Sequence, residues 1–117
     1  MANLQANLPN FFIAWPSDAT LTLIRRRRHH QRRFSNTRLR DQGGLWLRIA
    51  AHINRLHPNY FPTATQCRNK WNALKSGFEN LQRLNDEENV YTTHAPSYHD
   101  YEFHTELSDE FWKVECN

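Results

Sequence analysis

The side chains best suited to specific chemistry lie close together in residues 66–76. Asn pairs bidentately with N6 and N7 of adenine, and Arg pairs in the same way with O6 and N7 of guanine. Small side chains beside them would let a helix approach the base edges closely. We therefore predict that this stretch recognises bases in the DNA major groove through five residues: Arg68, Asn69, Asn72, Ala73 and Ser76.

Presenting these side chains together requires a helix whose opposite face is buried. Apolar residues recur here at intervals of four, three, four and three, which at roughly 100° per residue form one narrow stripe: Cys67, Trp71, Leu74, Phe78 and Leu81. We expect the helix to begin after a Thr63 or Thr65 cap and to end near residues 84–85. Cys67 falls on the apolar stripe, where we interpret it as a small core residue rather than a nucleophile or ligand.

Charge is distributed very unevenly along the 117 residues, although the formal net charge is only +3. Residues 1–78 hold thirteen Arg or Lys against two Asp, whereas residues 79–117 hold two against ten acids. This asymmetry predicts a polyanion-binding body followed by an acidic segment. The candidate DNA phosphate contacts are Arg25, Arg26, Arg32, Arg33, Arg38, Arg40, Lys70 and Lys75.

The basic run at residues 25–33 has three interpretations: contact with DNA phosphates, a nuclear-import signal, or a solvated helix face. The first two are compatible with each other. Four consecutive arginines cannot all point one way on a helix, and Arg28 follows Ile24 by one turn on the apolar side. Because an unpaired buried charge is costly, we predict that Arg28 pairs with an acid of the C-terminal segment.

The remaining pattern indicates three further helices. One is expected over residues 18–33 with Ser17 as its cap, followed by a loop at 34–44 that includes Gly43 and Gly44. A second spans 45–55, where Trp46, Ile49, Ala50 and Ile53 share a face, and the Pro-containing stretch 57–62 ends it. Aromatic residues from Tyr101 to Trp112 predict an amphipathic helix over about 98–115.

The third-helix motif Cys67-Arg68-Asn69-Lys70-Trp71-Asn72 resembles that of a Myb/SANT repeat, and the wider pattern resembles the trihelix, or Myb/SANT-like, DNA-binding domains. The resemblance is strong over residues 15–84 and weak over 98–112. It rests on four groups of residues: Trp15 with Leu23-Ile24; Leu45-Trp46 with Ile49-Ala50; Gln66-Cys67 with Lys70-Trp71 and Leu74-Lys75; and the aromatic pattern from Tyr101 to Phe111.

The resemblance implies an all-α fold in which three helices form a Myb/SANT-like cluster. Its second and third helices would be arranged like a helix-turn-helix, with a fourth amphipathic helix after them. The corresponding divisions are an N-terminal tail at 1–13, the DNA-binding domain at 14–84, an acidic linker at 85–97 and the C-terminal helix at 98–115. By motif position, the implied base contacts are Arg68, Asn69, Asn72 and Ala73. Many Myb repeats carry a polar residue where Ala73 stands.

The expected function is sequence-specific binding of double-stranded DNA by a nuclear transcription regulator or a transposon-derived module. The alternative is a protein-interaction or dimerisation module that uses the acidic, aromatic C-terminal segment. That segment either packs structurally on the domain or competes with DNA for the basic body.

Other classes of function find little support in the residues. We expect no enzyme, because no nucleophile stands beside a base and no glycine-rich phosphate loop is present. His94, His99 and His104 are spaced by five, which fits no usual zinc pattern, so we expect neither metal nor cofactor. No apolar stretch approaches the length of a membrane span.

Overall fold

The computed structural model describes residues 14–86 and 101–114, and it is helical throughout with no strand in those two ranges. Helix α1 (Ser17–His29) is followed by the short α2 (Gln31–Ser35) and a 3-10 turn, η3 (Leu39–Asp41). Next come α3 (Gly43–Leu56) and the long α4 (Ala64–Asp86). The C-terminal segment (residues 101–114) adds α6 (His104–Leu107) and the 3-10 turn η4 (Phe111–Lys113). The expected all-α class is confirmed.

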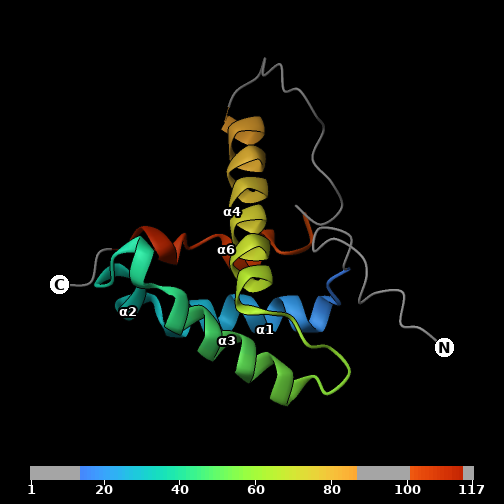
Figure 1. Ribbon diagram of the computed structural model, residues 1–117. Helices are drawn as coiled ribbons and strands as arrows, with labels where there is room; N and C mark the ends of the chain where they lie inside the picture. The colour runs from blue at the N-terminus through green and yellow to red at the C-terminus, as the bar shows by residue number, and fades with distance from the viewer. Residues whose placement is uncertain (1–13, 87–100, 115–117) are drawn as a thin grey trace.

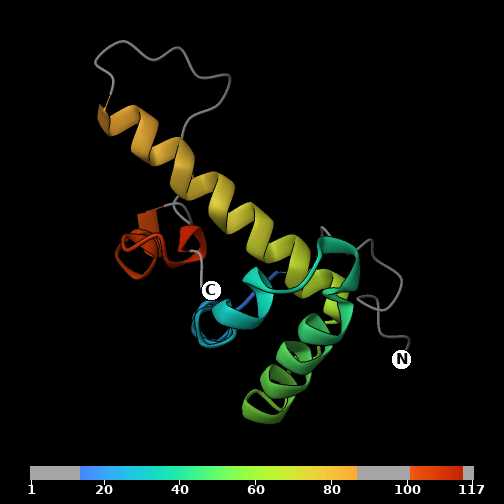
Figure 2. The ribbon, with the colours of Figure 1, turned by 90° about the vertical axis from the view of Figure 1, so that its left-hand side faces the viewer.

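Helices α1, α3 and α4 form the three-helix cluster. In Figure 1, α1 and α3 run across the base of the molecule and α4 stands on them. Figure 2 shows that the C-terminal half of α4 projects beyond the other helices. Twenty-three residues at 1.5 Å each make α4 about 35 Å long.

One hydrophobic core joins all of these elements. Leu23 of α1 and Ile49 and Ile53 of α3 are fully buried, and Trp71 of α4 is 1% exposed. The whole predicted stripe of α4, from Cys67 to Leu81, is buried. Burying a side chain as large as Trp71 contributes about 3 kcal/mol, which makes the α4 stripe a main source of stability.

The basic first helix differs from the sequence expectation in three ways. It divides at His30, whose φ of −96° and ψ of 10° leave the helical region, and α2 then continues to Ser35. This bend turns Phe34 into the core against Trp46, with ring centroids 4.9 Å apart. Ser17 is not the cap: Pro16 precedes the first turn, and the Ser17 hydroxyl donates to Glu102 Oε1 at 2.6 Å.

The second and third helices are joined as in a helix-turn-helix, with residues 57–63 between α3 and α4. Thr63 caps α4 through a reciprocal pair of bonds: its Oγ1 accepts from the Gln66 amide at 3.1 Å, and Gln66 Oε1 accepts from the Thr63 amide at 2.8 Å. Helix α3 begins at Gly43, two residues before the expected start, so Gly43 and Gly44 belong to its first turn rather than to a loop.

The C-terminal segment contributes helical turns, as expected, but in short pieces rather than one helix; residues 98–100 and 115 lie outside the described part. The break is at Glu110, whose φ of 49° lies in the left-handed region. A non-glycine residue there costs about 1 kcal/mol. The break allows Phe111 to stack on Trp71 at a centroid distance of 5.4 Å.

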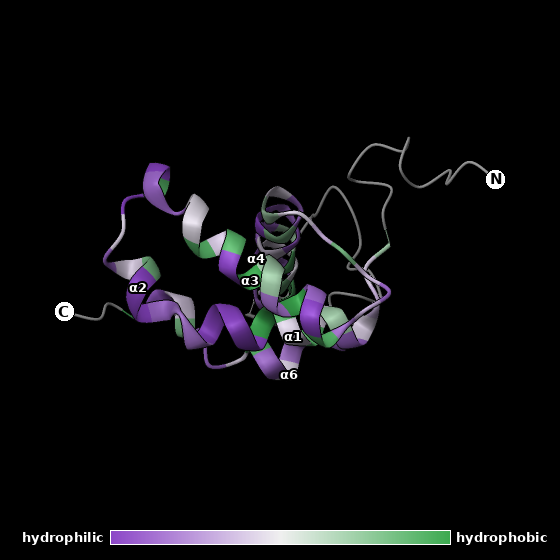
Figure 3. Cartoon of the chain, turned by 60° about the horizontal axis from the view of Figure 1, so that its bottom comes forward, coloured by the Kyte–Doolittle hydropathy of each residue, from purple (hydrophilic) through white to green (hydrophobic). Residues whose placement is uncertain are grey.

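The hydropathy pattern shows how this packing divides polar and apolar surface. In Figure 3, hydrophilic colour dominates the second half of α1, and the ribbon of α1 lies in front of α4. In the described part of the chain, no helix combines the length and apolar content needed to cross a bilayer.

Candidate nucleic-acid interface

All five predicted base contacts lie on the exposed face of α4. Arg68, Asn69, Asn72, Ala73 and Ser76 are exposed. Trp71 and Leu74, on the opposite face, are locked in the core at 1% and 7% exposure. The core therefore fixes the rotation of α4 about its axis, and the capping box fixes where the helix begins. We call this exposed set of five residues the α4 face.

Two lysines flank the α4 face. Lys70 and Lys75 are half-buried. The Lys75 ammonium lies 5.9 Å from the centroid of the Trp71 ring. Burial, followed by the charge of Arg27, lowers the pKa of Lys75, and the carboxylate of Glu79 acts in the opposite direction. A phosphate beside Lys75 would add to the negative charge of Glu79 and stabilise the charged ammonium.

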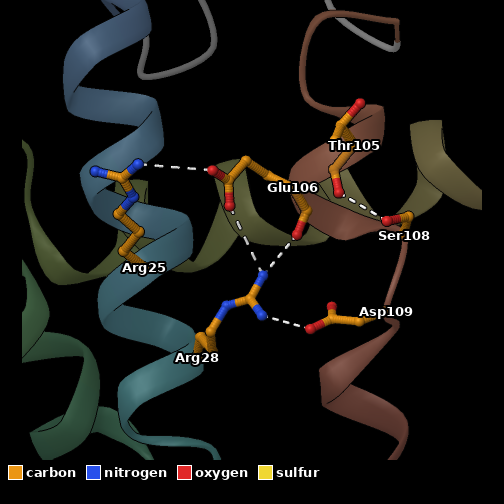
Figure 4. A network of polar contacts seen from close by, with 6 residues as sticks. All are labelled: Arg25, Arg28, Thr105, Glu106, Ser108 and Asp109. Atoms are coloured by element: carbon orange, nitrogen blue, oxygen red, sulfur yellow. Dashed lines mark hydrogen bonds and ion pairs between the residues drawn. The ribbon is translucent and has the colours of Figure 1, made fainter.

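Arg25 and Arg28 are held by acids of the C-terminal segment (Figure 4). Arg25 lies 3.6 Å from the Glu106 carboxylate. Arg28 donates through Nη2 to the Glu106 carbonyl at 2.6 Å and through Nη1 to Asp109. The guanidinium also lies 4.7 Å from the Phe111 ring centroid. The predicted pairing of Arg28 is confirmed, and Arg25, whose side chain is 63% exposed, also lies beside an acid of this segment.

Arg27 enters the core, which the sequence analysis did not anticipate. Its guanidinium stacks 4.0 Å from the Phe34 centroid and 5.3 Å from that of Trp71. It also donates to Gln31 Oε1 at 2.5 Å. Burial lowers the Arg27 pKa to about 10, so it remains charged at neutral pH. The signal was present in the sequence, because residues 23, 24, 27, 31 and 34 follow a helical core spacing that ignores residue polarity.

A second group of cations lies where α1 and α2 meet α3. We define the α1–α3 face as Arg26, His30, Arg33, Arg48, His52 and Arg55. The positive charges of Arg26, Arg33 and Arg48 help to lower the pKa of His30. Those of Arg26 and Arg55 do the same for His52. Arg48 and Arg55 were missed by the sequence analysis. Their signal was the spacing 48, 52 and 55, which places three basic side chains on one side of α3.

The remaining phosphate candidates are also exposed. Arg38 and Arg40 lie at η3, before the first turn of α3. Arg32 lies beside Arg33 and Arg48 around a hollow of about 610 Å³. The structure thus divides the eight candidates among the flanks of α4, the η3 region, the α1–α3 face and the C-terminal acids, instead of gathering them on one surface.

Histidine has structural partners in the described residues. His57 Nε2 lies 2.8 Å from Thr22 Oγ1, and its Nδ1 lies 3.4 Å from an Asp18 oxygen, which ties the end of α3 to α1. His104 Nε2 lies 3.2 Å from Gln82 Oε1. His94 and His99 are outside the described part. Among the residues that are described, no group of three or more His, Cys, Asp or Glu is placed to hold a metal ion.

The C-terminal aromatic residues are used inside the domain. Phe103 and Phe111 are buried, and the half-buried Trp112 lies edge-on to Trp71 and Phe78 at 5.6 and 5.5 Å. These three side chains therefore pack within the domain and do not form an exposed aromatic surface. Tyr101, at 61% exposure, remains on the surface.

Comparison with known proteins gives one match. The family model described as "Myb/SANT-like DNA-binding domain" matches residues 13–107. The match therefore includes the three-helix cluster and extends into the C-terminal segment as far as Leu107. No curated protein and no solved structure matches the chain.

Proposed function

Because the chain belongs to the Myb/SANT-like DNA-binding domain family over residues 13–107, we propose that it recognises a specific sequence in double-stranded DNA with α4 in the major groove. DNA binding in general follows from the family, which is not a class of enzymes. The observation that carries the finer proposal is the α4 face: five small or hydrogen-bonding side chains are exposed together on a helix fixed by the core.

Each member of the α4 face has a role in this proposal. Asn69 and Asn72 recognise adenine through N6 and N7, and Arg68 recognises guanine through O6 and N7. Ala73 and Ser76 bring the helix close to the base edges because they lack bulk. Lys70 and Lys75 then contact phosphates on either side and set the position of the helix in the groove.

Further phosphate contacts come from Arg32, Arg38 and Arg40, which are exposed around α2 and η3. Arg26 and Arg33 belong to the α1–α3 face and are not counted among these contacts, and a contact from Arg25 would compete with Glu106. Roughly six contacts correspond to a log–log dependence of affinity on salt with a slope of about −5. The proposed role is transcription regulation, or DNA binding in a transposon-derived protein, in the nucleus.

The test begins with selection of the preferred site from randomised duplexes. Asn72→Ala should then cost about 1–3 kcal/mol on that site and blur preference at one base pair, while binding to random duplex stays unchanged. Asn59→Ala, an exposed Asn outside α4, is the matched control and should leave both affinities unaltered. An equal loss on every sequence after Asn72→Ala would refute base recognition by this residue.

A further inference from the structure

The α1–α3 face is a second basic surface, separate from the α4 face. Along α1 and α2, Arg26, His30 and Arg33 are spaced by four and three residues, and along α3 so are Arg48, His52 and Arg55. At 1.5 Å per residue, each row extends about 10 Å. The two rows belong to helices that pack together, and their buried stripes point toward α4. The cations therefore lie on the outer side of that pair.

Contacts at both ends show that the two rows belong to one surface. At one end, Arg33 and Arg48 line the same hollow with Arg32 and Gly44. At the other, Thr22 of α1 bonds His57 at the end of α3 at 2.8 Å. Between these ends, the charge of Arg26 lowers the pKa of both His30 on the first row and His52 on the second.

Little negative charge opposes this surface within the described residues. Asp41 lines the hollow, and Asp18 lies against His57 at the far end. The acids of the C-terminal segment are committed elsewhere, because Glu106 and Asp109 hold Arg25 and Arg28 on another side of α1. In residues 14–86 and 101–114, no ion pair engages Arg33, Arg48 or Arg55.

We propose that the α1–α3 face binds the sugar-phosphate backbone of a second DNA duplex while α4 occupies the first. A single chain then joins two duplexes, or two distant segments of one. This inference rests on the proposed function for the first duplex, and the second contact is independent of base sequence. The phosphates of a duplex form a continuous row along each strand, so a row of cations can follow part of one backbone.

The side chains of this face favour a phosphate backbone over a protein partner. Hot spots of protein interfaces combine arginine with tryptophan and tyrosine side chains buried in pockets. The six residues of the α1–α3 face include no tryptophan or tyrosine and are all cations or imidazoles. Arginine guanidinium groups match phosphate oxygens bidentately.

Binding of phosphate there should also take up protons. The pKa of His30 is lowered by burial and by Arg26, His29, Arg33 and Arg48, and that of His52 by burial and by Arg26, Arg55, His29 and His57. Phosphates placed among these cations would raise both pKa values. Capture of the second duplex should therefore be stronger at pH 6.5 than at pH 7.5.

The experiment uses the full chain on an immobilised duplex that carries the selected site. After washing, a fluorescent random duplex is added, and the amount captured is measured at pH 7.5 and pH 6.5. The unaltered chain should capture it. The double variant Arg48→Gln, Arg55→Gln should reduce capture at least tenfold and keep first-duplex affinity within about twofold. Arg83→Gln with Lys113→Gln removes the same charge elsewhere and should capture normally.

The outcomes separate this proposal from the proposed function. If the double variant Arg48→Gln, Arg55→Gln captures the second duplex normally, the proposed second contact is wrong. If the double variant loses affinity for the first duplex, the chain has a single DNA-binding surface, and the proposal is also wrong. The proposal is also wrong if light scattering shows a dimer that the double variant dissociates. The same holds if the chain captures polyglutamate more strongly than duplex. If Arg68→Ala with Asn72→Ala leaves site preference intact, α4 recognition fails, whatever the capture result.

Discussion

Replacing Arg28 by Ala tests whether the C-terminal segment is held to α1 by the contacts shown in Figure 4. The side chain donates to the Glu106 carbonyl at 2.6 Å, pairs with Asp109 and stacks on Phe111 at 4.7 Å. Arg28 is 38% exposed and Asp109 50%, so solvent screening limits the ion pair to about 0.5–1 kcal/mol. The carbonyl bond adds about 1 kcal/mol and the ring contact about 0.5 kcal/mol.

Arg28→Ala should therefore lower the free energy of unfolding by about 2 kcal/mol. The assay is urea unfolding of the full chain, monitored by tryptophan fluorescence. This signal reports on the attachment of the segment because Trp112 of the segment packs against Trp71 of α4. A double-mutant cycle with Asp109→Ala isolates the ion pair and should give a coupling of about 0.5–1 kcal/mol. The coupling should shrink in 0.5 M salt, since the pair is partly exposed.

Arg38→Ala provides the control, because Arg38 is exposed and its loss should change stability by less than about 0.5 kcal/mol. Zero coupling between Arg28 and Asp109 at low salt would refute the pairing. A loss after Arg28→Ala no larger than that of the control would refute the wider argument that these contacts fasten the segment.

Three further predictions concern the stability of the fold, its dependence on pH, and the reactivity of the buried thiol. Trp71→Ala should cost about 3–5 kcal/mol in urea unfolding, enough to unfold much of a marginally stable domain, because it leaves a cavity between α4, α1 and η4. Lowering the pH from 7.5 to 5.5 should destabilise the fold: the pKa values of His30 and His52 are below that of free histidine, so the unfolded chain binds more protons. Replacing both by Gln should flatten that pH dependence. Burial raises the pKa of Cys67 to about 12, so in a Cys116→Ser background its thiol should react with a disulfide reagent only after unfolding.

The α4 stripe was predictable because period and polarity agree there. Cys67, Trp71, Leu74 and Phe78 are apolar at helical spacing, and all are buried. Once this stripe is assigned to the core, the geometry of a helix places Arg68, Asn69 and Asn72 on its exposed side. Where residue type and position disagree, prediction is harder: the polar Asn80 follows the α4 face in sequence, yet it is 5% exposed.

The basic helix could be predicted only in part. The expectation that Arg28 meets an acid came from position and charge, and the structure confirms it. The burial of Arg27 could not be inferred from residue type, because its cost is offset by two aromatic rings that come from α2 and α4. Such compensation depends on tertiary contacts, as does the break at Glu110 that lets Phe111 reach Trp71.

The stacking of Phe111 on Trp71 has a consequence for how the protein is made. Synthesis runs from the N-terminus, so α4 is complete well before Phe103, Leu107 and Phe111 emerge to cover it. Until then the aromatic side chains of α4, Trp71 and Phe78, are not covered by the C-terminal segment. A chain truncated before Phe103 would therefore carry an exposed hydrophobic surface that marks it for chaperones and proteases.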